Sequence, residues 1–303
     1  MTLLYASTAA RGAVWQRIFA AAGEPIIMGE AAVTDRAEVT AIACWQPPAD
    51  LAAYPNLRAV ISVGAGVDQM PALPPGVALS RTLAPGIETM VRDWVVMAAL
   101  ALHRDLPLYL DQGRRGLWQA HAPRAAGRTR IGIMGMGRIG TLAAGTLAAM
   151  GFPVTGWSRS ARPAGDIAVL GAADLPAFLS RTDLLVCLLP LTPQTRGILG
   201  DDLFARLPQG ARLVHAGRGA QLDMPALRRA LDGGRIAAAM LDVTDPEPLP
   251  PDHWAWSDPR VIVTPHVAAQ TDDREGGDHA LSVMRALRAG QPVPGAVDPA
   301  RGY

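Results

Sequence analysis

The sequence predicts an α/β protein with two doubly wound domains, each built on a parallel sheet. Three observations lead to this prediction. Short apolar segments alternate with windows rich in Ala and Leu, which is the pattern of strand–helix–strand units. A glycine-rich turn directly follows one of these segments in the middle of the chain. The chain has 303 residues, of which 50% are hydrophobic and 18% charged, so it can fill two cores and is not disordered.

The N-terminal third carries the first series of elements. Five brief apolar runs, each ended by Gly, Pro or polar residues, predict strands at residues 3–6, 26–28, 41–45, 59–63 and 77–80. Residues 13–22 predict a helix between the first two strands. After Pro85 and Gly86, residues 90–103 predict a long helix that is apolar on nearly all sides, which favours burial between layers or domains.

A loop rich in Arg, Gly and Pro is expected at residues 112–130, and the alternation of strands and helices then resumes from 130–134 to 261–264. The last helix is expected at 274–289, and neither it nor the tail at 290–303 is paired with a further predicted strand. We therefore expect the second domain to interrupt the first. Residues 1–98 and 269–303 would form the first domain, and residues 99–268 the second.

The composition excludes several classes of function. With 28 basic and 27 acidic residues the net charge is +1, so no global electrostatic attraction to nucleic acid or to an anionic membrane is expected. All 28 basic residues are Arg, which excludes a Schiff-base lysine and the lysine of a P-loop. Cys44 and Cys187 are too few for a zinc site or a disulfide framework, which fits a reducing cytosol.

The N-terminus does not have the pattern of a targeting signal, and the longest uncharged run does not have that of a membrane-spanning helix. Residues 1–10 contain no basic residue ahead of their apolar stretch, unlike a targeting signal. Residues 139–158 carry no charge, but four glycines and Pro153 divide them into a helix, a break and a strand. We expect a cytoplasmic protein with no metal, nucleic-acid or membrane partner.

The glycine-rich turn has the form G-x-G-x-x-G over residues 135–140, after a predicted strand and before a helical window at 141–150. Gly135 permits a tight turn, Gly137 lets the backbone approach a pyrophosphate, and Gly140 allows close packing of helix on strand. A tight turn without any ligand is the alternative. A second strand predicted at 154–157, at the expected distance, favours dinucleotide binding.

The residues after that second strand predict which dinucleotide binds. NAD-specific sites place an Asp or Glu there to bind the ribose 2′-hydroxyl, and this chain has neither between Gly140 and Asp166. Arg159 can offer a 2′-phosphate several donors, and Ser158 and Ser160 add hydroxyls. NADPH is therefore expected, with NADH as a weaker alternative. The competing interpretation is a surface Arg159 that stacks on the adenine of either cofactor.

Three further clusters follow predicted strands: residues 213–219 with Arg218, 240–250 with Asp242 and Glu247, and 263–269 with His266. They resemble the D-isomer-specific 2-hydroxyacid dehydrogenase family, whose members carry an Arg between two glycines, a Glu before Pro and a His after Thr-Pro. The intervals of 29 and 19 residues between the three side chains also fit. One departure is His215, where the family usually has Asn.

The resemblance extends over most of the chain. Residues 62–68 resemble the family's substrate-carboxylate loop, and residues 188–195 resemble a loop on the cofactor side. The stretch that starts at Trp45 and the terminal residues 297–303 are similar to one branch, the bacterial glyoxylate/hydroxypyruvate reductase A type. The resemblance implies a Rossmann cofactor domain inserted in a flavodoxin-like substrate domain, and a homodimer. It also implies that Trp118 can reach the partner's substrate site, although a packing role is an equal alternative.

The implied activity is NADPH-dependent reduction of small 2-keto acids, glyoxylate to glycolate and hydroxypyruvate to glycerate. Arg218 would hold the carboxylate and the carbonyl oxygen in its planar fork. His266 would protonate the emerging alkoxide, and Glu247 would orient His266 and favour its charged form. Asp242 would accept a hydrogen bond from the nicotinamide carboxamide.

The expected cofactor-binding residues lie in the glycine turn and at four strand ends: Gly135, Met136, Gly137, Arg138, Ile139, Gly140, Trp157, Ser158, Arg159, Ser160, Leu189, Pro190, Thr195, Ala216, Gly217, Asp242 and His266. The expected substrate-binding residues are Gly64, Ala65, Gly66, Trp118, Arg218 and His266. The loop 64–66 offers backbone N–H groups without bulk, which favours two- and three-carbon substrates.

Each site residue alone has an ordinary explanation: a solvated arginine, a glutamate facing water, a histidine satisfied within the core. Two other functions remain open. One is a 2-hydroxyacid dehydrogenase for a larger 2-keto acid, and the other is a dinucleotide-binding sensor or scaffold without catalysis. We expect Cys187 to be a buried, inert thiol within a strand, and His253, next to Trp254, to serve loop packing.

Overall fold

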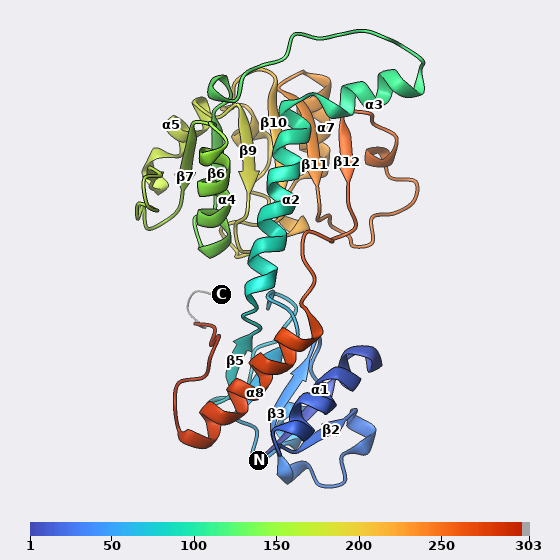
Figure 1. The fold of residues 1–303 in the computed structure, drawn as a ribbon, viewed down its shortest axis with the longest axis vertical. Coiled ribbons are helices and arrows are strands. Elements are labelled where there is room, and N and C mark those ends of the chain that lie inside the picture. The colour runs from blue at the N-terminus through green and yellow to red at the C-terminus, as the bar shows by residue number, and fades with distance from the viewer. Residues whose placement is uncertain (299–303) are drawn as a thin grey trace. The chain divides into compact units, whose positions relative to one another are not determined.

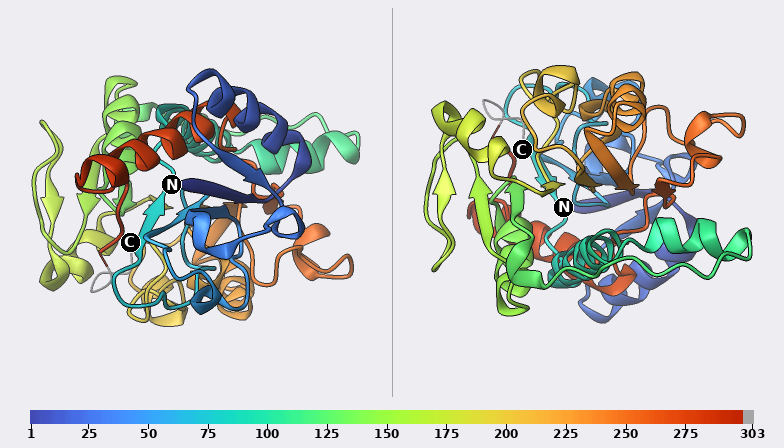
Figure 2. Two further views of the ribbon diagram at one scale, coloured as in Figure 1. Left: turned by 90° about the horizontal axis from the view of Figure 1, so that it is seen from below. Right: turned by 90° about the horizontal axis from the view of Figure 1, so that it is seen from above.

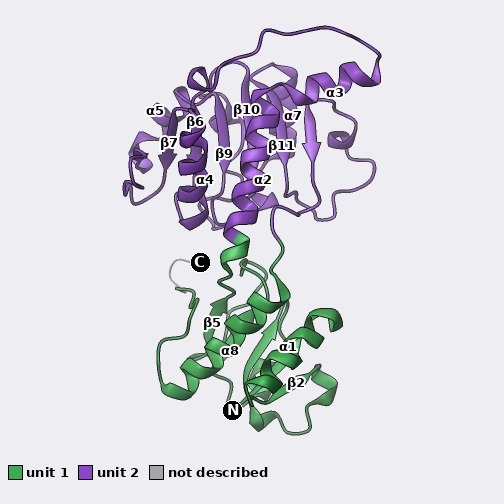
Figure 3. Ribbon diagram, viewed as in Figure 1, with its two compact units in different colours: residues 1–87, 270–303 green, residues 88–269 purple. Residues whose placement is uncertain are grey.

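The computed structural model describes residues 1–298, which divide into two units (Figure 3). Unit 1 comprises Met1–Ile87 and the chain from Gln270 onward, and unit 2 is Glu88–Ala269. The sequence placed the first boundary after residue 98, whereas the observed boundary lies near the start of the long helix α2 (Pro85–His103). Of the terminal segment 297–303, residues 299–303 lie outside the described part of the chain.

Unit 1 contains a sheet of five parallel strands in the order β2-β1-β3-β4-β5. The strands are β1 (Thr2–Ala6), β2 (Ile26–Met28), β3 (Val39–Cys44), β4 (Ala59–Ser62) and β5 (Ala78–Arg81). All residues of β3 are buried, as expected for a central strand that is covered on both faces. The strand order is that of flavodoxin-like folds, so the doubly wound sheet predicted for this part is confirmed.

One face of this sheet is covered by two helices from opposite ends of the chain, α1 (Ala9–Ala21) and α8 (Asp273–Ala289) (Figure 1). A Cβ atom on Gly277 would lie 2.6 Å from Ile18 Cδ1, and one on Gly276 would lie 3.1 Å from the ring of Trp15. The two glycines therefore allow the helices to approach closely. The last helix thus belongs to the first unit. The other face carries short 3₁₀ turns, including η3 (Leu51–Ala53), over a second apolar cluster.

Unit 2 contains a sheet of seven parallel strands in the order β12-β11-β10-β9-β6-β7-β8. The strands are β6 (Ile131–Met134), β7 (Val154–Trp157), β8 (Val169–Leu170), β9 (Leu184–Cys187), β10 (Ala211–His215), β11 (Ile236–Leu241) and β12 (Val261–Val263). This order is that of a Rossmann fold. The direction of winding reverses between β6 and β9, the place where ligands bind in open α/β sheets.

Helices cover both faces of the second sheet (Figure 2). On one face lie α2 and α4 (Arg138–Ala149). On the other lie α5 (Leu175–Ser180), α6 (Asp201–Phe204) and α7 (Met224–Asp232), which enclose the larger apolar core. Among the described residues, no helix is long and apolar enough to cross a membrane, and no group of side chains has the composition of a metal site.

The long helix was expected to be buried between layers or domains. Most of its apolar side chains are buried, and in the single chain Met97 is 47% exposed. The helix is followed by α3 (Leu106–Arg114), which extends into the segment predicted as a loop from residue 112. Several large apolar side chains of this region face solvent in the single chain: Met97, Leu106, Leu108, Tyr109, Leu110, Leu117 and Trp118.

Candidate active site

The glycine turn after β6 is shaped by close contacts at its first and third glycines. Gly135 has φ +103°, and a Cβ atom there would lie 2.6 Å from the carbonyl oxygen of Leu188. A Cβ atom on Gly140 would overlap the carbonyl oxygen of Gly135. At Gly137, in contrast, no described atom apart from its neighbours in the chain lies within 4 Å of the Cβ position. Gly135 and Gly140 are thus required by the fold, whereas Gly137 leaves the backbone open to a ligand.

Helix α4 presents an N-terminus suited to an anion. Gly137 is its N-cap residue, and its first turn contains no acidic residue, so the N–H groups and the helix dipole can act on a phosphate. Arg138, in this first turn, forms an ion pair with Glu88 (Nε to Oε1, 2.7 Å). Met136 packs against β7, where a Cβ atom on Gly156 would lie 2.5 Å from its Cγ. Ile139 is half-buried in the first turn.

The end of β7 places basic and hydroxyl side chains at the carboxyl edge of the sheet. The Trp157 indole is buried and donates to the Gly171 carbonyl (2.9 Å), which anchors the strand end. Ser158 follows, half-buried, and its amide donates to the Leu170 carbonyl (3.0 Å). Arg159 and Ser160 are exposed. This group of donors suits a phosphate on the ribose.

The turn that carries Arg218 follows β10 and is confined by its neighbours. A Cβ atom on Gly217 would overlap Oε1 of Gln221, and one on Gly219 would overlap the carbonyl oxygen of Thr244. The Gly-Arg-Gly sequence is therefore dictated by packing on both sides of the arginine. The Arg218 guanidinium donates from Nη1 to the Gly217 carbonyl (2.8 Å). Ahead of the turn, the Ala216 amide continues the strand pairing to Cys187.

The structure brings Glu247 and His266 together. Oε2 of Glu247 lies 2.9 Å from Nδ1 of His266, and the two side chains are 39% and 41% exposed. The other carboxylate oxygen, Oε1, accepts the Thr244 amide (3.0 Å), so both oxygens of Glu247 are engaged. The imidazole therefore directs Nε2 away from the carboxylate. Because Gly219 packs on Thr244, the Arg218 turn and the Glu247 loop are in direct contact.

His266 has φ +52°, a left-handed conformation that costs a non-glycine residue about 1–3 kcal/mol. Asp242, which is 2% exposed, holds this loop in place. Its Oδ1 accepts from the Thr264 hydroxyl (2.6 Å) and the Val267 amide (2.9 Å), and its Oδ2 accepts from the Ala268 amide (2.9 Å). The contact of Asp242 with a nicotinamide carboxamide stays a prediction. Its role in holding the histidine loop was not predicted.

Sequence reasoning also missed Gln221, which is fully buried. Its Nε2 donates to the carbonyls of Leu189 (3.0 Å) and Pro190 (2.9 Å), and its Oε1 accepts the Arg218 amide (2.8 Å). The predicted cofactor loop and the arginine turn are thus joined by one side chain. Its position three residues after Arg218, the interval of a capping box, was the available signal. Thr195 closes the same loop by donating to Pro190 O (2.7 Å).

The predicted substrate loop follows β4 in unit 1. Ser62 donates to the Gly66 carbonyl (2.7 Å), and Gln69 Nε2 lies 3.3 Å from both Ser62 Oγ and Gly66 O. Within residues 1–298, the amides of Ala65 and Gly66 donate to no other group. Gly64 faces Trp45, whose ring would lie 3.1 Å from a Cβ atom there. Neither Ser62 nor Gln69 was singled out from the sequence.

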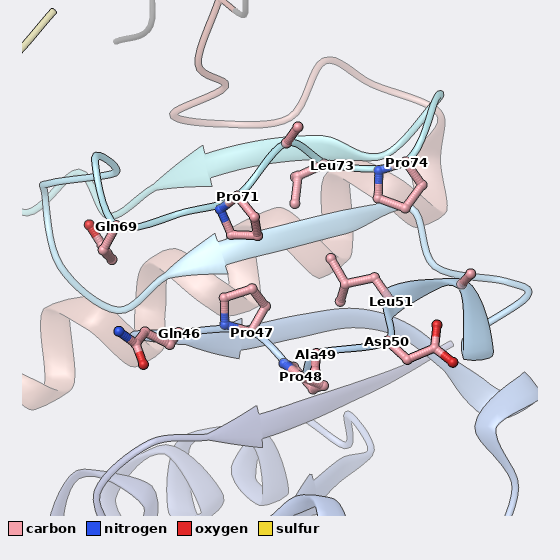
Figure 4. A pocket seen from close by; sticks show the side chains of 12 residues that line it. Gln46, Pro47, Pro48, Ala49, Asp50, Leu51, Gln69, Pro71, Leu73 and Pro74 are labelled. Atoms are coloured by element: carbon pink, nitrogen blue, oxygen red, sulfur yellow. The ribbon is translucent and has the colours of Figure 1, made fainter.

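A hollow of about 660 Å³ also opens in unit 1 (Figure 4). Two loops line it, residues 46–52 and 69–74, with prolines at four positions: Pro47, Pro48, Pro71 and Pro74. Asp50 is the one charged residue among those that line it, and no cationic side chain is present. This hollow therefore offers no cationic side chain to the carboxylate of a keto acid or to a nucleotide phosphate.

The remaining predicted residues are found as follows. Cys187 is fully buried in β9, and burial raises the pKa of its thiol to about 12, as it does for Cys44, so both are inert. His253 accepts the Ala255 amide (3.3 Å) and packs beside the Trp254 ring, which agrees with a packing role. Trp118 is fully exposed in the single chain.

Comparison with known proteins gives concordant matches. Residues 96–268 match the family model described as the NAD-binding domain of D-isomer specific 2-hydroxyacid dehydrogenases. The chain is 40% identical, over 86% of either sequence, to glyoxylate/hydroxypyruvate reductase A of Yersinia enterocolitica. It is 37% identical, over 86% of each, to the protein of the same name from Salmonella newport.

Two solved structures are similar over the whole chain. One is a D-isomer specific 2-hydroxyacid dehydrogenase from Xanthobacter autotrophicus Py2, in complex with NADPH and MES. It has a TM-score of 0.92 and 36% identity, with coverage of 100% of this chain and 99% of the other. The second is an NADPH-dependent glyoxylate/hydroxypyruvate reductase from Sinorhizobium meliloti, in complex with NADP and sulfate. Its TM-score is 0.91 at 35% identity, with the same coverage.

Proposed function

Because the chain belongs to the D-isomer specific 2-hydroxyacid dehydrogenase family, we propose that it is an NADPH-dependent reductase of small 2-keto acids. Its substrates would be glyoxylate, reduced to glycolate, and hydroxypyruvate, reduced to glycerate, as the names of its relatives suggest. The observation that carries the proposal is the pair of His266 and Glu247 at 2.9 Å, packed against the turn that presents Arg218.

Each of these side chains has a defined part in the reduction. The Arg218 guanidinium binds the substrate carboxylate and polarises the carbonyl oxygen, for which its planar fork of donors is suited. His266 gives a proton to the carbonyl oxygen from Nε2, because Nδ1 faces Glu247. Glu247 is held by the Thr244 amide and so fixes the orientation of the imidazole. In unit 1, the Ala65 and Gly66 amides, which donate to no other described group, suit a carboxylate. NADPH, when bound, supplies the hydride.

The residues of unit 2 fit this cofactor. The open space at Gly137 and the N-terminus of α4 suit the pyrophosphate. Arg159, with Ser158 and Ser160, suits the 2′-phosphate, and two structural relatives are described with NADPH or NADP. Arg159→Asp should lower or reverse the preference for NADPH over NADH, chiefly through NADPH affinity. Equal efficiency of the unmodified protein with both cofactors would show that this segment does not read the 2′ position.

The catalytic assignment is tested by the absorbance of NADPH during turnover of glyoxylate. His266→Ala should leave NADPH binding intact and lower turnover by about 10²–10⁴-fold. Arg218→Ala should lower kcat/KM, because a few kcal/mol of transition-state stabilisation are lost with the guanidinium. Tight NADPH binding without any oxidation by glyoxylate or hydroxypyruvate would indicate a sensor instead. A clear preference for phenylpyruvate or branched keto acids would indicate a dehydrogenase for larger substrates.

A homodimer is part of the proposal. The apolar side chains that α2, α3 and the following segment expose form the surface for the second copy, which explains why so many large ones lie together. Light scattering with size-exclusion chromatography gives the mass in solution. A protein of 31.8 kDa at all concentrations would contradict the homodimer, and Leu110→Asp should weaken it.

A further inference from the structure

The peptide groups of Arg218 are held from both sides by two buried side chains. The Arg218 amide donates to Gln221 Oε1 (2.8 Å). The Arg218 carbonyl lies 3.0 Å from Nε2 of His215 and also accepts the Gln221 amide (3.0 Å). His215 and Gln221 have no exposed surface, so water does not compete for these bonds. The arginine therefore sits on a backbone whose polar groups are both fixed.

The hydrogen bond from His215 determines its ring form. A carbonyl can only accept, so Nε2 carries the hydrogen and donates it to Arg218. Burial lowers the pKa of His215 to about 4. The backbone groups of Arg218 and Cys187 and the charge of Asp242 oppose this lowering, and the charge of Arg218 adds to it. At neutral pH the ring is therefore uncharged and does not repel the guanidinium. Among the described residues, Nδ1 has no hydrogen-bond partner.

We propose that His215 is a positioning residue for the reduction: by donating from Nε2 to the Arg218 carbonyl, it sets the direction in which the turn presents the guanidinium to the keto acid. The inference rests on the proposed function, since it requires that Arg218 binds substrate. Gln221 secures the amide side of the same residue and ties it to the loop at Leu189 and Pro190. Because His215 has no exposed surface, it can act on the substrate only through Arg218.

Three substitutions at His215 separate the hydrogen bond from simple packing. Leucine fills space but donates nothing. Glutamine extends about as far from Cα as Nε2 of the imidazole, so its amide can restore the donor. Asparagine is one bond shorter and should not reach. The matched control is His103→Leu, which removes another buried histidine of unit 2, bonded to Thr129 (3.1 Å) away from the Arg218 turn.

Steady-state kinetics with glyoxylate and NADPH should distinguish these variants. We expect His215→Leu and His215→Asn to raise KM for glyoxylate and lower kcat, with kcat/KM reduced by about tenfold or more, because a misplacement of 1 Å can cost about 10²-fold. The Kd for NADPH, measured by fluorescence titration, should stay unchanged. His215→Gln should recover most of the lost efficiency. His103→Leu should lower the unfolding midpoint and leave KM as it is.

A double-mutant cycle with Arg218→Ala gives the decisive comparison. If His215 acts through Arg218, His215→Leu should have almost no further effect on kcat/KM once Arg218 is alanine. Multiplicative losses in the double variant, or a His215→Leu protein that behaves like His103→Leu, would overturn the inference while leaving the proposed function intact. If instead the unmodified protein reduces neither glyoxylate nor hydroxypyruvate, the proposed function is wrong and the inference falls with it.

Hydrogen exchange supplies a readout that does not depend on turnover. The Arg218 amide is protected by Gln221 Oε1, and the turn is kept closed by the bond from His215. His215→Leu should therefore speed amide exchange in a peptide that spans residues 216–221, whereas His215→Gln should not. Unchanged exchange in the leucine variant would contradict the positioning role even if its activity were low.

Discussion

Replacement of Asp242 by Asn tests how firmly the His266 loop depends on one buried carboxylate. The carboxylate accepts three hydrogen bonds, two at Oδ1 and one at Oδ2. An asparagine must place its NH₂ group at one of these oxygens, so it confronts either the Ala268 amide or the Val267 amide with a second donor. At least one hydrogen bond to a charged acceptor is lost, and the remaining ones become bonds to a neutral acceptor. Hydrogen bonds to charged groups contribute about 1.5–3 kcal/mol each, which puts the loss of unfolding free energy at about 2–4 kcal/mol.

Thr264→Val is the matched control, because it removes only the hydroxyl donor and leaves Asp242 with both backbone amides. We expect it to cost about 1–2 kcal/mol. Urea denaturation at pH 7 measures both losses, and NADPH oxidation with glyoxylate measures turnover in the same samples. Since His266 keeps its left-handed backbone only while the loop is held, Asp242→Asn should also lower kcat by about 10–100-fold. An Asp242→Asn protein no less stable than Thr264→Val, with normal kcat, would refute the assignment of Asp242 as the group that holds this loop.

Three further outcomes are expected. Burial lowers the pKa of His215 from 6.5 to about 4, so the unfolded chain binds the proton more tightly and stability falls as the pH drops through this range. Relative to His215→Gln, the unmodified protein should lose about 3 kcal/mol between pH 7 and pH 4 in urea unfolding, and parallel pH profiles would disprove the buried neutral ring. Gly219→Ala should cost about 3 kcal/mol or more in thermal unfolding and abolish most activity, because its Cβ would overlap the Thr244 carbonyl; a fully active, stable variant would show that this contact yields easily. Asp105→Asn leaves the nearly buried Arg212 guanidinium without its carboxylate, with an expected loss of about 2 kcal/mol, whereas no measurable loss would mean that solvent serves the guanidinium equally well.

Local patterns sufficed to predict most of the architecture. The second strand of unit 2 was expected at 154–157, where β7 is found, because a short apolar run between a Pro and polar residues leaves little freedom. Helix α2 begins earlier than expected, at Pro85. Proline breaks a helix interior, but it is tolerated in the first turn, where its missing N–H has no partner to lose. The apolar composition of α2 indicated burial. Composition alone cannot show which face of the helix packs against the rest of the protein.

The site was only partly predictable, because several of its residues act through contacts that are distant in sequence. The sequence motif indicated Arg218, Glu247 and His266, and the structure brings the last two together. The roles of Asp242 and Gln221 depend on which loops meet them in space, and neither the spacing nor the residue type shows that. His215 was noted only as a departure from the family. Its hydrogen bond to the Arg218 carbonyl depends on the folded conformation of the turn, which the sequence does not show.

The interrupted layout of unit 1 imposes an order on synthesis. Residues 88–269 emerge from the ribosome as one uninterrupted stretch, so the seven-stranded sheet can assemble as soon as it is made. Unit 1 has its strands earlier, yet the part of its apolar cluster that includes Trp15 and Phe19 is completed only by α8, which is translated after the whole of unit 2. The part translated first is thus the part completed last. A nascent chain halted after residue 269 would contain all of unit 2 but would lack α8 of unit 1. Only unit 1 would then expose apolar surface that chaperones can bind.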